Sequence, residues 1–312
     1  MTDPSASAGA PLAEPPRHPR RVVYLGTPEI AVAPLVALHE AGFEIPLVVT
    51  GANKRRGRGS GATPTPVKLA ALERALPVSH DVDDIPAARA DLGVVVAYGR
   101  ILRRPLLETL AMVNLHFSLL PRWRGAAPVE RAILAGDDGT GVCVMAVEEG
   151  LDTGGVSASA EVAVRRTSTA AELSGQLATL GSRLLVSTLR SGLGLPAPQV
   201  GEPTYAAKMT PADRGLDWDL SAPALDRVVR VGGAWSTFRG RRLTVHAGRP
   251  WPAEVGPGAP GELHGDRVTT CEGTLQLVAV QPEGKSKVPF SDWVNGARPE
   301  SGERLGGDGD RP

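Results

Sequence analysis

Residues 92–116 read LGVVVAYGRILRRPLLETLAMVNLH and begin and end on short apolar runs, Leu92–Ala97 and Met112–His116. Runs that are apolar on both faces are typical of strands covered by helices on both sides of a parallel sheet. Such strands alternate here with helical patterns, which predicts an α/β domain with a mainly parallel sheet. Further strands are expected at 21–25, 45–50 and 142–147, and helices at 28–40, 67–76 and 128–135.

The pattern changes near residue 204. Thr169 and Glu172 form a capping-box pattern that predicts a long helix reaching about Leu189. The stretch GLGLPAPQVGEP that follows reads as a linker. Beyond it, short β-like segments are separated by Gly and Pro, which predicts a small β-barrel. The expected divisions are a disordered tail at 1–20, a first domain at 21–191, a linker at 192–203, a second domain at 204–306 and a tail at 307–312.

The composition of the chain limits the kinds of partner that the protein can bind. Lysine and arginine total 34, as do aspartate and glutamate, so nucleic acid must be bound by local basic patches. The two cysteines, Cys143 and Cys271, show no disulfide or metal-ligand spacing, and we expect no metal. No apolar stretch has the length of a membrane span, and the first twenty residues do not resemble a signal peptide. We expect a cytoplasmic protein without membrane contact.

Polar residues gather around the end of the strand at 112–116. Asn114 and His116 are two residues apart, so they project to the same side of the strand. In open α/β sheets, ligands bind at the carboxyl ends of the strands. An amide donor beside an imidazole suits a reaction that develops negative charge on a carbonyl oxygen. Asp152, if the fold brings it near, could orient the imidazole and favour its protonated form.

Each of these residues also has an ordinary structural explanation. An Asn-x-His pair on a strand is often structural, and an Asp before Thr-Gly is usually part of a turn. Arg122 and Arg124 alone would most often be solvated surface residues. Their joint occurrence in one order is what favours a functional site.

The stretch from Asn114 to Pro128, together with Gly150–Gly154, resembles the signature of the folate-dependent formyltransferases. The segments SLLPRWRGAAPV and GLDTG are most similar to the branch that acts on methionyl-tRNA. The resemblance extends from residue 21 to about residue 305. It implies a Rossmann-like formyltransferase domain, followed by an OB-type β-barrel that binds tRNA. It also places the family's catalytic residues at Asn114, His116 and Asp152.

The resemblance implies 10-formyltetrahydrofolate as co-substrate and the α-amine of initiator methionyl-tRNA as acceptor, in a protein that we expect to be a monomer. We assign Asn114 and protonated His116 to the developing oxyanion, and Asp152 to supporting that charge and assisting proton transfer. The residues expected to hold the folate are Tyr98, Gly99, Arg100, Leu102, Ser118, Leu119, Leu120 and Pro121.

Two basic clusters are candidates for tRNA contacts. The first lies in a Gly-rich loop and comprises Lys54, Arg55, Arg56 and Arg58; the second comprises Arg239, Arg241 and Arg242. Flexible arginines can follow phosphates, although a solvated loop explains the same composition. Three alternatives share the scaffold: a formyltransferase for a small amine such as a sugar nucleotide, a formyl-folate hydrolase, and a catalytically silent RNA-binding protein.

Overall fold

The computed structural model describes residues 11–55, 62–251 and 258–306. The chain divides into two compact units. The first comprises residues 1–128, 139–163 and 174–207, and the second comprises residues 129–138, 164–173 and 208–312. The predicted tail at 307–312 lies outside the described residues. Within the described ranges, no helix combines the length and the apolar character needed to cross a membrane.

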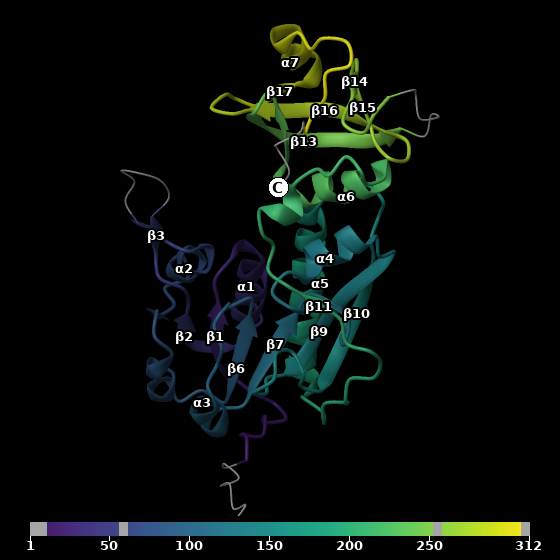
Figure 1. The fold of residues 1–312 in the computed structure, drawn as a ribbon. Helices are drawn as coiled ribbons and strands as arrows, with labels where there is room; N and C mark the ends of the chain where they lie inside the picture. The colour runs from purple at the N-terminus through teal and green to yellow at the C-terminus, as the bar shows by residue number, and fades with distance from the viewer. Residues whose placement is uncertain (1–10, 56–61, 252–257, 307–312) are drawn as a thin grey trace, which may run out of the picture. The chain divides into compact units, whose positions relative to one another are not determined.

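The first unit is built on a seven-stranded sheet with the order β10-β9-β7-β6-β1-β2-β5. Strands β5, β2, β1, β6 and β7 pair in parallel, and β9 and β10 are antiparallel. The predicted mainly parallel sheet is therefore confirmed. Its strands are β1 (Arg21–Gly26), β2 (Glu44–Val49), β5 (Val78–Ser79), β6 (Leu92–Val96), β7 (Met112–His116), β9 (Gly139–Ala146) and β10 (Val156–Ala163). Figure 1 shows β6 and β7 side by side within it.

Strand β10 was not predicted. It lies at the edge of the sheet, and its residues VSASAEVA are small, partly polar and mostly half-buried or exposed. An edge strand packs against one neighbour only, so its sequence lacks the apolar run that marked the central strands.

Two helices begin at side-chain caps. Thr65 accepts a hydrogen bond from the Lys68 N–H at the start of α2. Thr169 and Glu172 exchange the bonds of the predicted capping box. The bonds from the Thr169 N–H and hydroxyl to the Glu172 carboxylate lower the pKa of Glu172. The helices up to this point are α1 (Val32–Glu40), preceded by a 3-10 turn (Glu29–Ala31), α2 (Pro66–Leu72), α3 (Arg104–Thr109), α4 (Pro128–Ala135) and α5 (Ala170–Ser191).

Two segments predicted to be free of the domain are bound to it. Residues 11–20 were expected in a disordered tail, but part of this segment contacts the first unit. The Ala13 N–H donates to the Leu107 carbonyl, and Leu12 packs against the core. The expected linker, residues 192–203, is bridged to the edge strand, where Val156 and Ala197 exchange backbone hydrogen bonds of 2.8 and 2.9 Å. Composition predicted a disordered tail and a linker, and these backbone bonds attach residues of both segments to the first unit.

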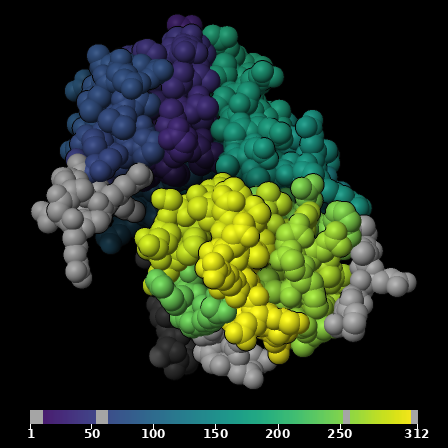
Figure 2. Space-filling model, turned by 90° about the horizontal axis from the view of Figure 1, so that it is seen from above, coloured from purple at the N-terminus to yellow at the C-terminus, as the bar shows by residue number. Residues whose placement is uncertain are grey.

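The second unit contains a six-stranded antiparallel sheet in which β13 and β16 form the longest pair. Its core includes Phe290, stacked on Trp293 with ring centroids 5.1 Å apart. The elements are α6 (Ala222–Val231), β12 (Ala234–Phe238), β13 (Arg241–Trp251), β14 (Leu263–His264), β15 (Arg267–Thr269), β16 (Thr274–Pro282), β17 (Val288–Pro289) and α7 (Phe290–Ala297). The predicted second domain rich in antiparallel strands is confirmed, whereas α6 and α7 were not predicted. Figure 2 shows the last described residues, up to 306 and coloured yellow, on the surface of this unit.

Two short pairings complete the first unit. β3 (Lys54–Arg55) and β4 (Ala62–Thr63) pair antiparallel, so the two ends of the basic loop are held together, while residues 56–61 lie outside the description. β8 (Arg124–Gly125) pairs in parallel with β11 (Tyr205–Ala206). The second pairing joins the loop after β7 to the residues that directly follow the predicted linker.

Candidate active site

Asn114 and His116 lie on β7 at the carboxyl end of the sheet. Asn114 is in register with Val95 of β6, and His116 with Cys143 of β9. His116 is almost fully buried, at 5% exposure, and Asn114 is half-buried. Because β7 is flanked on both sides, the two side chains are held at a fixed place on the sheet edge where ligands bind in this fold class.

Asp152 meets both residues from the turn between β9 and β10. Its Oδ1 accepts a hydrogen bond of 3.3 Å from Asn114 Nδ2, and its Oδ2 lies 3.6 Å from His116 Nδ1. Oδ2 also accepts a 2.8 Å bond from the backbone N–H of Gly125. The three residues singled out in the sequence are therefore brought together around one carboxylate.

The turn that carries Asp152 is tightly constrained. Asp152 has a φ of +53°, an uncommon conformation for a residue with a side chain. A Cβ at Gly154 would lie 2.0 Å from the Ala146 carbonyl oxygen, so only glycine fits there. The Gly-Leu-Asp-Thr-Gly sequence thus folds as it does because its last glycine allows the backbone to approach β9.

The surroundings of His116 fix its tautomer. Its Nε2 lies 2.9 Å from the Trp123 carbonyl oxygen, which can only accept, so Nε2 carries a proton. Nδ1 faces Asp152 and holds a second proton when the ring is charged. Each ring nitrogen therefore faces a protein oxygen. The structure differs here from the expectation that His116 points at the oxyanion, because the loop after β7 folds back over Nε2.

Asn114 keeps donor capacity for a ligand. Its Nδ2 carries two protons, and Asp152 takes one of them. Among the described residues it makes no other side-chain hydrogen bond. The second proton is the donor in this cluster that a substrate oxygen can reach.

The loop SLLPRWRG after β7 is held by its own bonds and by the stretch before β11. Ser118, fully buried, donates from its hydroxyl to the Arg122 carbonyl at 2.6 Å. The Trp123 N–H donates to Thr204 Oγ1 at 2.9 Å, and the peptide between Leu120 and Pro121 is cis. Ser118 therefore stabilises the loop, while Leu119, Leu120 and Pro121 are half-buried along it.

The other predicted folate wall follows β6. Tyr98 is 5% exposed and packs in the core, and in the described structure its hydroxyl is buried without a hydrogen-bond partner. Gly99 has a φ of +76° and open space where a side chain would lie. Arg100 is exposed, with Nη1 3.4 Å from the His80 carbonyl oxygen, and Leu102 packs against the same core as Tyr98. Since β6 pairs with β7, this turn lies beside Asn114.

The predicted tRNA residues have different surroundings. Arg56 and Arg58 lie outside the described residues, as do the side chains of Lys54 and Arg55. Arg239 pairs with both carboxylate oxygens of Glu303, at 2.5 and 2.7 Å, which raises the pKa of Arg239 and lowers that of Glu303. Arg241, with 71% of its side chain exposed, and Arg242, 4.7 Å above the Trp235 ring, remain at the surface.

Two contacts at the site were missed from the sequence. The first is the bond from the Gly125 N–H to Asp152, which a sequence pattern cannot reveal because every residue other than proline has a backbone N–H. Gln199 lies in the Pro-rich stretch read as a linker, yet its side chain bonds the carbonyl oxygens of Asp152 and Gly154, both at 2.8 Å. A lone amide among prolines and glycines was the one available signal.

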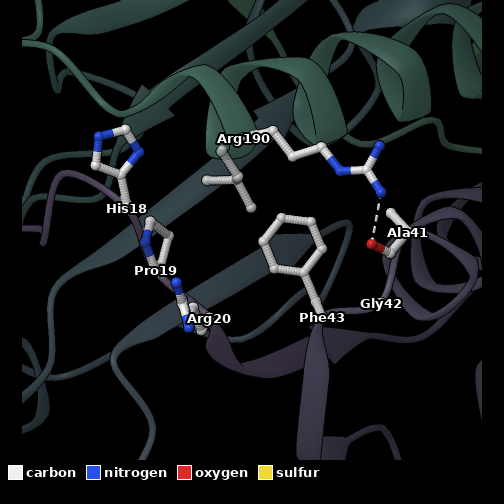
Figure 3. A pocket seen from close by; sticks show the side chains of 8 residues that line it. His18, Pro19, Arg20, Ala41, Gly42, Phe43 and Arg190 are labelled. Carbon is white, nitrogen blue, oxygen red and sulfur yellow. Dashed lines mark hydrogen bonds between the residues drawn. The ribbon is translucent and has the colours of Figure 1, made fainter.

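A cavity of about 460 Å³ lies elsewhere on the first unit (Figure 3). It is lined by residues that precede β1 and by the ends of α1 and α5, so it opens at the amino end of the strands. Arg190 donates to the Ala41 carbonyl at 2.6 Å, which satisfies the end of α1. This cavity is thus a packing feature at the edge opposite Asn114.

Comparison with known proteins identifies the family. The formyl transferase model matches residues 20–189, and the model of the formyl transferase C-terminal domain matches residues 208–298. The chain belongs to the formyl transferase family. It is 40% identical to proteins named methionyl-tRNA formyltransferase from Symbiobacterium thermophilum and Ruegeria pomeroyi, over 91% of this chain and 95% and 100% of theirs.

Solved structures share the fold at lower identity. An N-formyltransferase from Helicobacter canadensis, in complex with folinic acid and dTDP-3-aminofucose, superposes with a TM-score of 0.64 at 14% identity, covering 84% of this chain and 99% of that one. HypX from Aquifex aeolicus in complex with tetrahydrofolic acid gives 0.61 at 18% identity, over 92% of this chain and 48% of that one. These likenesses support the architecture of the formyl transferase.

Proposed function

We propose that this formyl transferase moves the formyl group of 10-formyltetrahydrofolate onto the α-amine of methionyl-initiator tRNA. The observation that carries the proposal is 40% identity, over nearly the full length of both chains, to proteins named for that activity. The cluster of Asn114, His116 and Asp152 supplies the chemistry that the reaction needs.

The reaction exchanges one bond to the formyl carbon for another. The amine nitrogen forms a bond to that carbon, the bond from the carbon to the folate nitrogen breaks, and one amine proton ends on that nitrogen. A model α-amine has a pKa of about 7.7–8.0, so a useful fraction is neutral near pH 7. The protein must therefore position the amine, stabilise the oxyanion and move one proton.

The residues divide these tasks between them. Asn114 donates its second Nδ2 proton to the formyl oxygen, where negative charge develops. Asp152, which faces His116 Nδ1, receives or relays the amine proton and stabilises the charged imidazole. This assignment replaces a direct bond from His116 to the oxyanion, because both ring nitrogens face protein oxygens.

The two turns beside Asn114 fit a folate. Gly99 has no atom within 4 Å of a Cβ position, so a flat ring can approach its backbone. Ile101, at 89% exposure, offers apolar surface in the same turn. The backbone of 97–102 and the half-buried residues Leu119, Leu120 and Pro121 would hold the co-substrate, which supplies the formyl carbon when bound.

The tRNA would be held by the basic loop between β3 and β4 and by Arg241 and Arg242. Salt-dependent phosphate contacts suit exposed arginines. The enzyme is proposed to act as a monomer in the cytoplasm, in line with the translation role that its relatives' names carry.

The test is formyl transfer from 10-formyltetrahydrofolate to charged initiator tRNA, with elongator methionyl-tRNA and a sugar-nucleotide amine in parallel. Product on the initiator tRNA alone, lost in His116→Ala, is the expected result. Product on the small amine, or free formate alone, would refute the proposed acceptor while leaving the chemistry of the cluster in place. No product with any acceptor would refute both.

A further inference from the structure

Gln199 connects two loops of the site through one side-chain amide. Its Nε2 donates to the carbonyl oxygens of Asp152 and Gly154, at 2.8 Å each. Its Oε1 accepts from Arg124 Nε at 3.0 Å and from Arg124 Nη2 at 2.6 Å. Both donor protons and the acceptor oxygen of the Gln199 amide are therefore in use, and every bond goes to Asp152 or to a residue close to it.

These bonds close a ring around Asp152. The Asp152 carboxylate accepts from the Gly125 N–H, and Gly125 follows Arg124 in the chain. The Arg124 guanidinium binds Gln199, which returns to the Asp152 carbonyl. Both ends of Asp152, its carboxylate and its backbone carbonyl, are therefore fastened to the same loop after β7.

Asp152 needs such support because its backbone is strained. A residue with a side chain at φ +53° lies in the sparsely populated left-handed region and persists there because its surroundings hold it. A hydrogen bond on each carbonyl flanking Thr153 fixes the turn in that conformation. Without them the turn can relax, and the carboxylate would leave Asn114 and His116.

We propose that Gln199 is a positioning residue for the formyl transfer, acting through Asp152; this rests on the proposed function. An amide is required at this place because it combines two donors for the carbonyls with an acceptor for Arg124. Glutamate keeps the acceptor and loses the donors, and lysine or arginine keeps donors and loses the acceptor.

Gln199→Glu separates the two halves of this arrangement. The new carboxylate retains Arg124 but faces the Asp152 and Gly154 carbonyls with an oxygen, so it repels the turn. We expect kcat to fall about 10²-fold, as for a displacement of about 1 Å in a catalytic group, with KM for folate and tRNA little changed. Gln176→Glu, an exposed position on α5 with the same charge change, is the control and should match the wild type.

Two readouts separate positioning from mere folding. In an Asp152→Asn background, Gln199→Glu should add little further loss of kcat, because the group it positions is gone. The NMR chemical shifts of the His116 ring protons, recorded in the absence of substrates, should change in Gln199→Glu, because Asp152 faces the ring, and stay unchanged in Gln176→Glu. Gln199→Ala removes the hydrogen bonds without introducing the repulsion, so kcat should also fall, but by less than in Gln199→Glu.

The opposite outcomes overturn the proposal. Wild-type kcat in Gln199→Glu, losses that add fully to those of Asp152→Asn, or unchanged chemical shifts of the His116 ring would each assign Gln199 to structure alone. The NMR measurement needs no acceptor, so it still tests the positioning role if the wild type fails to formylate tRNA, in which case the proposed function fails by itself.

Discussion

The Oδ2 atom of Asp152 lies 2.8 Å from the backbone nitrogen of Gly125 and accepts its hydrogen bond. Gly125 has a φ of +122°, and a Cβ there would lie 2.7 Å from the Ala206 carbonyl oxygen. The donor that holds the Asp152 carboxylate therefore depends on a glycine that lies against β11. A side chain at this position forces Gly125 or the facing strand β11 to shift, and a shift of Gly125 would carry its N–H away from Asp152.

Gly125→Ala is expected to lower both kcat and stability. The displaced N–H releases Asp152, which should cost about 10²-fold in kcat. Gly42→Ala is the matched control, since Gly42 also has a positive φ, +82°, but has open space around it. That control should lose about 1 kcal/mol of stability from backbone strain and keep wild-type kcat. Equal kcat in the two variants would contradict the role given to the Gly125 N–H.

Asn114→Ala should act mainly on kcat. It removes the donor assigned to the oxyanion, and losing one such donor typically costs about 10²–10³ in rate. KM for folate and tRNA should change little, because the bond strengthens only as charge develops. Single-turnover kinetics with both substrates saturating measures the step directly. Asn295→Ala, at an exposed position on α7, serves as control, and a matching loss there would point to folding instead.

The central part of the fold could be read from the sequence because burial leaves a clear pattern. The run Leu92–Val96 is fully buried, and Met112–His116 matches the predicted strand residue for residue. Strand β10 lies at the edge of the sheet, carries a weaker pattern and was missed. Helices α6 and α7 were also missed, although both bury apolar residues in the core of the second unit. The segment at 192–203 was predicted as a linker, but its attachment to the edge strand could not be predicted, because the backbone hydrogen bonds that hold Ala197 to Val156 leave no trace in composition.

The residues of the candidate site could be predicted from the sequence, but the orientations and contacts of their side chains could not. Local order on β7 placed Asn114 and His116 together, and the resemblance to the family supplied Asp152. The orientation of His116 depends on the Trp123 carbonyl, which reaches Nε2 only because the loop after β7 folds back. The same holds for Arg239. It forms an ion pair with Glu303, 64 residues away in the sequence, and no local sequence pattern reveals such a contact.

The second basic cluster is expected to divide into structural and binding residues. Arg239→Ala should lower the melting temperature of the protein, since it breaks the paired contact with Glu303, and leave KM for tRNA near the wild-type value. Arg241→Ala should raise KM for tRNA and reduce the slope of log affinity against log salt by about 1, as for one lost phosphate contact. The two effects are measured by thermal unfolding and by salt-dependent tRNA binding. A salt slope changed by Arg239→Ala would restore that residue to the binding surface.

Asp213 should make the second unit sensitive to acid. A hydrogen bond of 2.7 Å from Arg131, then bonds from the Thr210 hydroxyl and N–H, hold the pKa of Asp213 well below its usual value. A carboxyl whose folded pKa is depressed contributes stability above its unfolded pKa of about 3.9, and this contribution is lost as the pH falls through the folded value. Asp213→Asn should therefore lower the free energy of unfolding by on the order of 1 kcal/mol at pH 7.

The difference between Asp213→Asn and the wild type should shrink as the pH falls from about 4 towards 2. Urea unfolding at a series of pH values measures it, followed by tryptophan fluorescence, to which Trp235 contributes from close by, since its ring N–H donates to the Pro211 carbonyl at 3.0 Å. Glu272→Gln, which neutralises an exposed carboxylate in the same unit, is the control. A difference that stays constant through this range would mean that the bonds to Arg131 and Thr210 do not stabilise the ionised form, and the acid sensitivity would need another carboxylate.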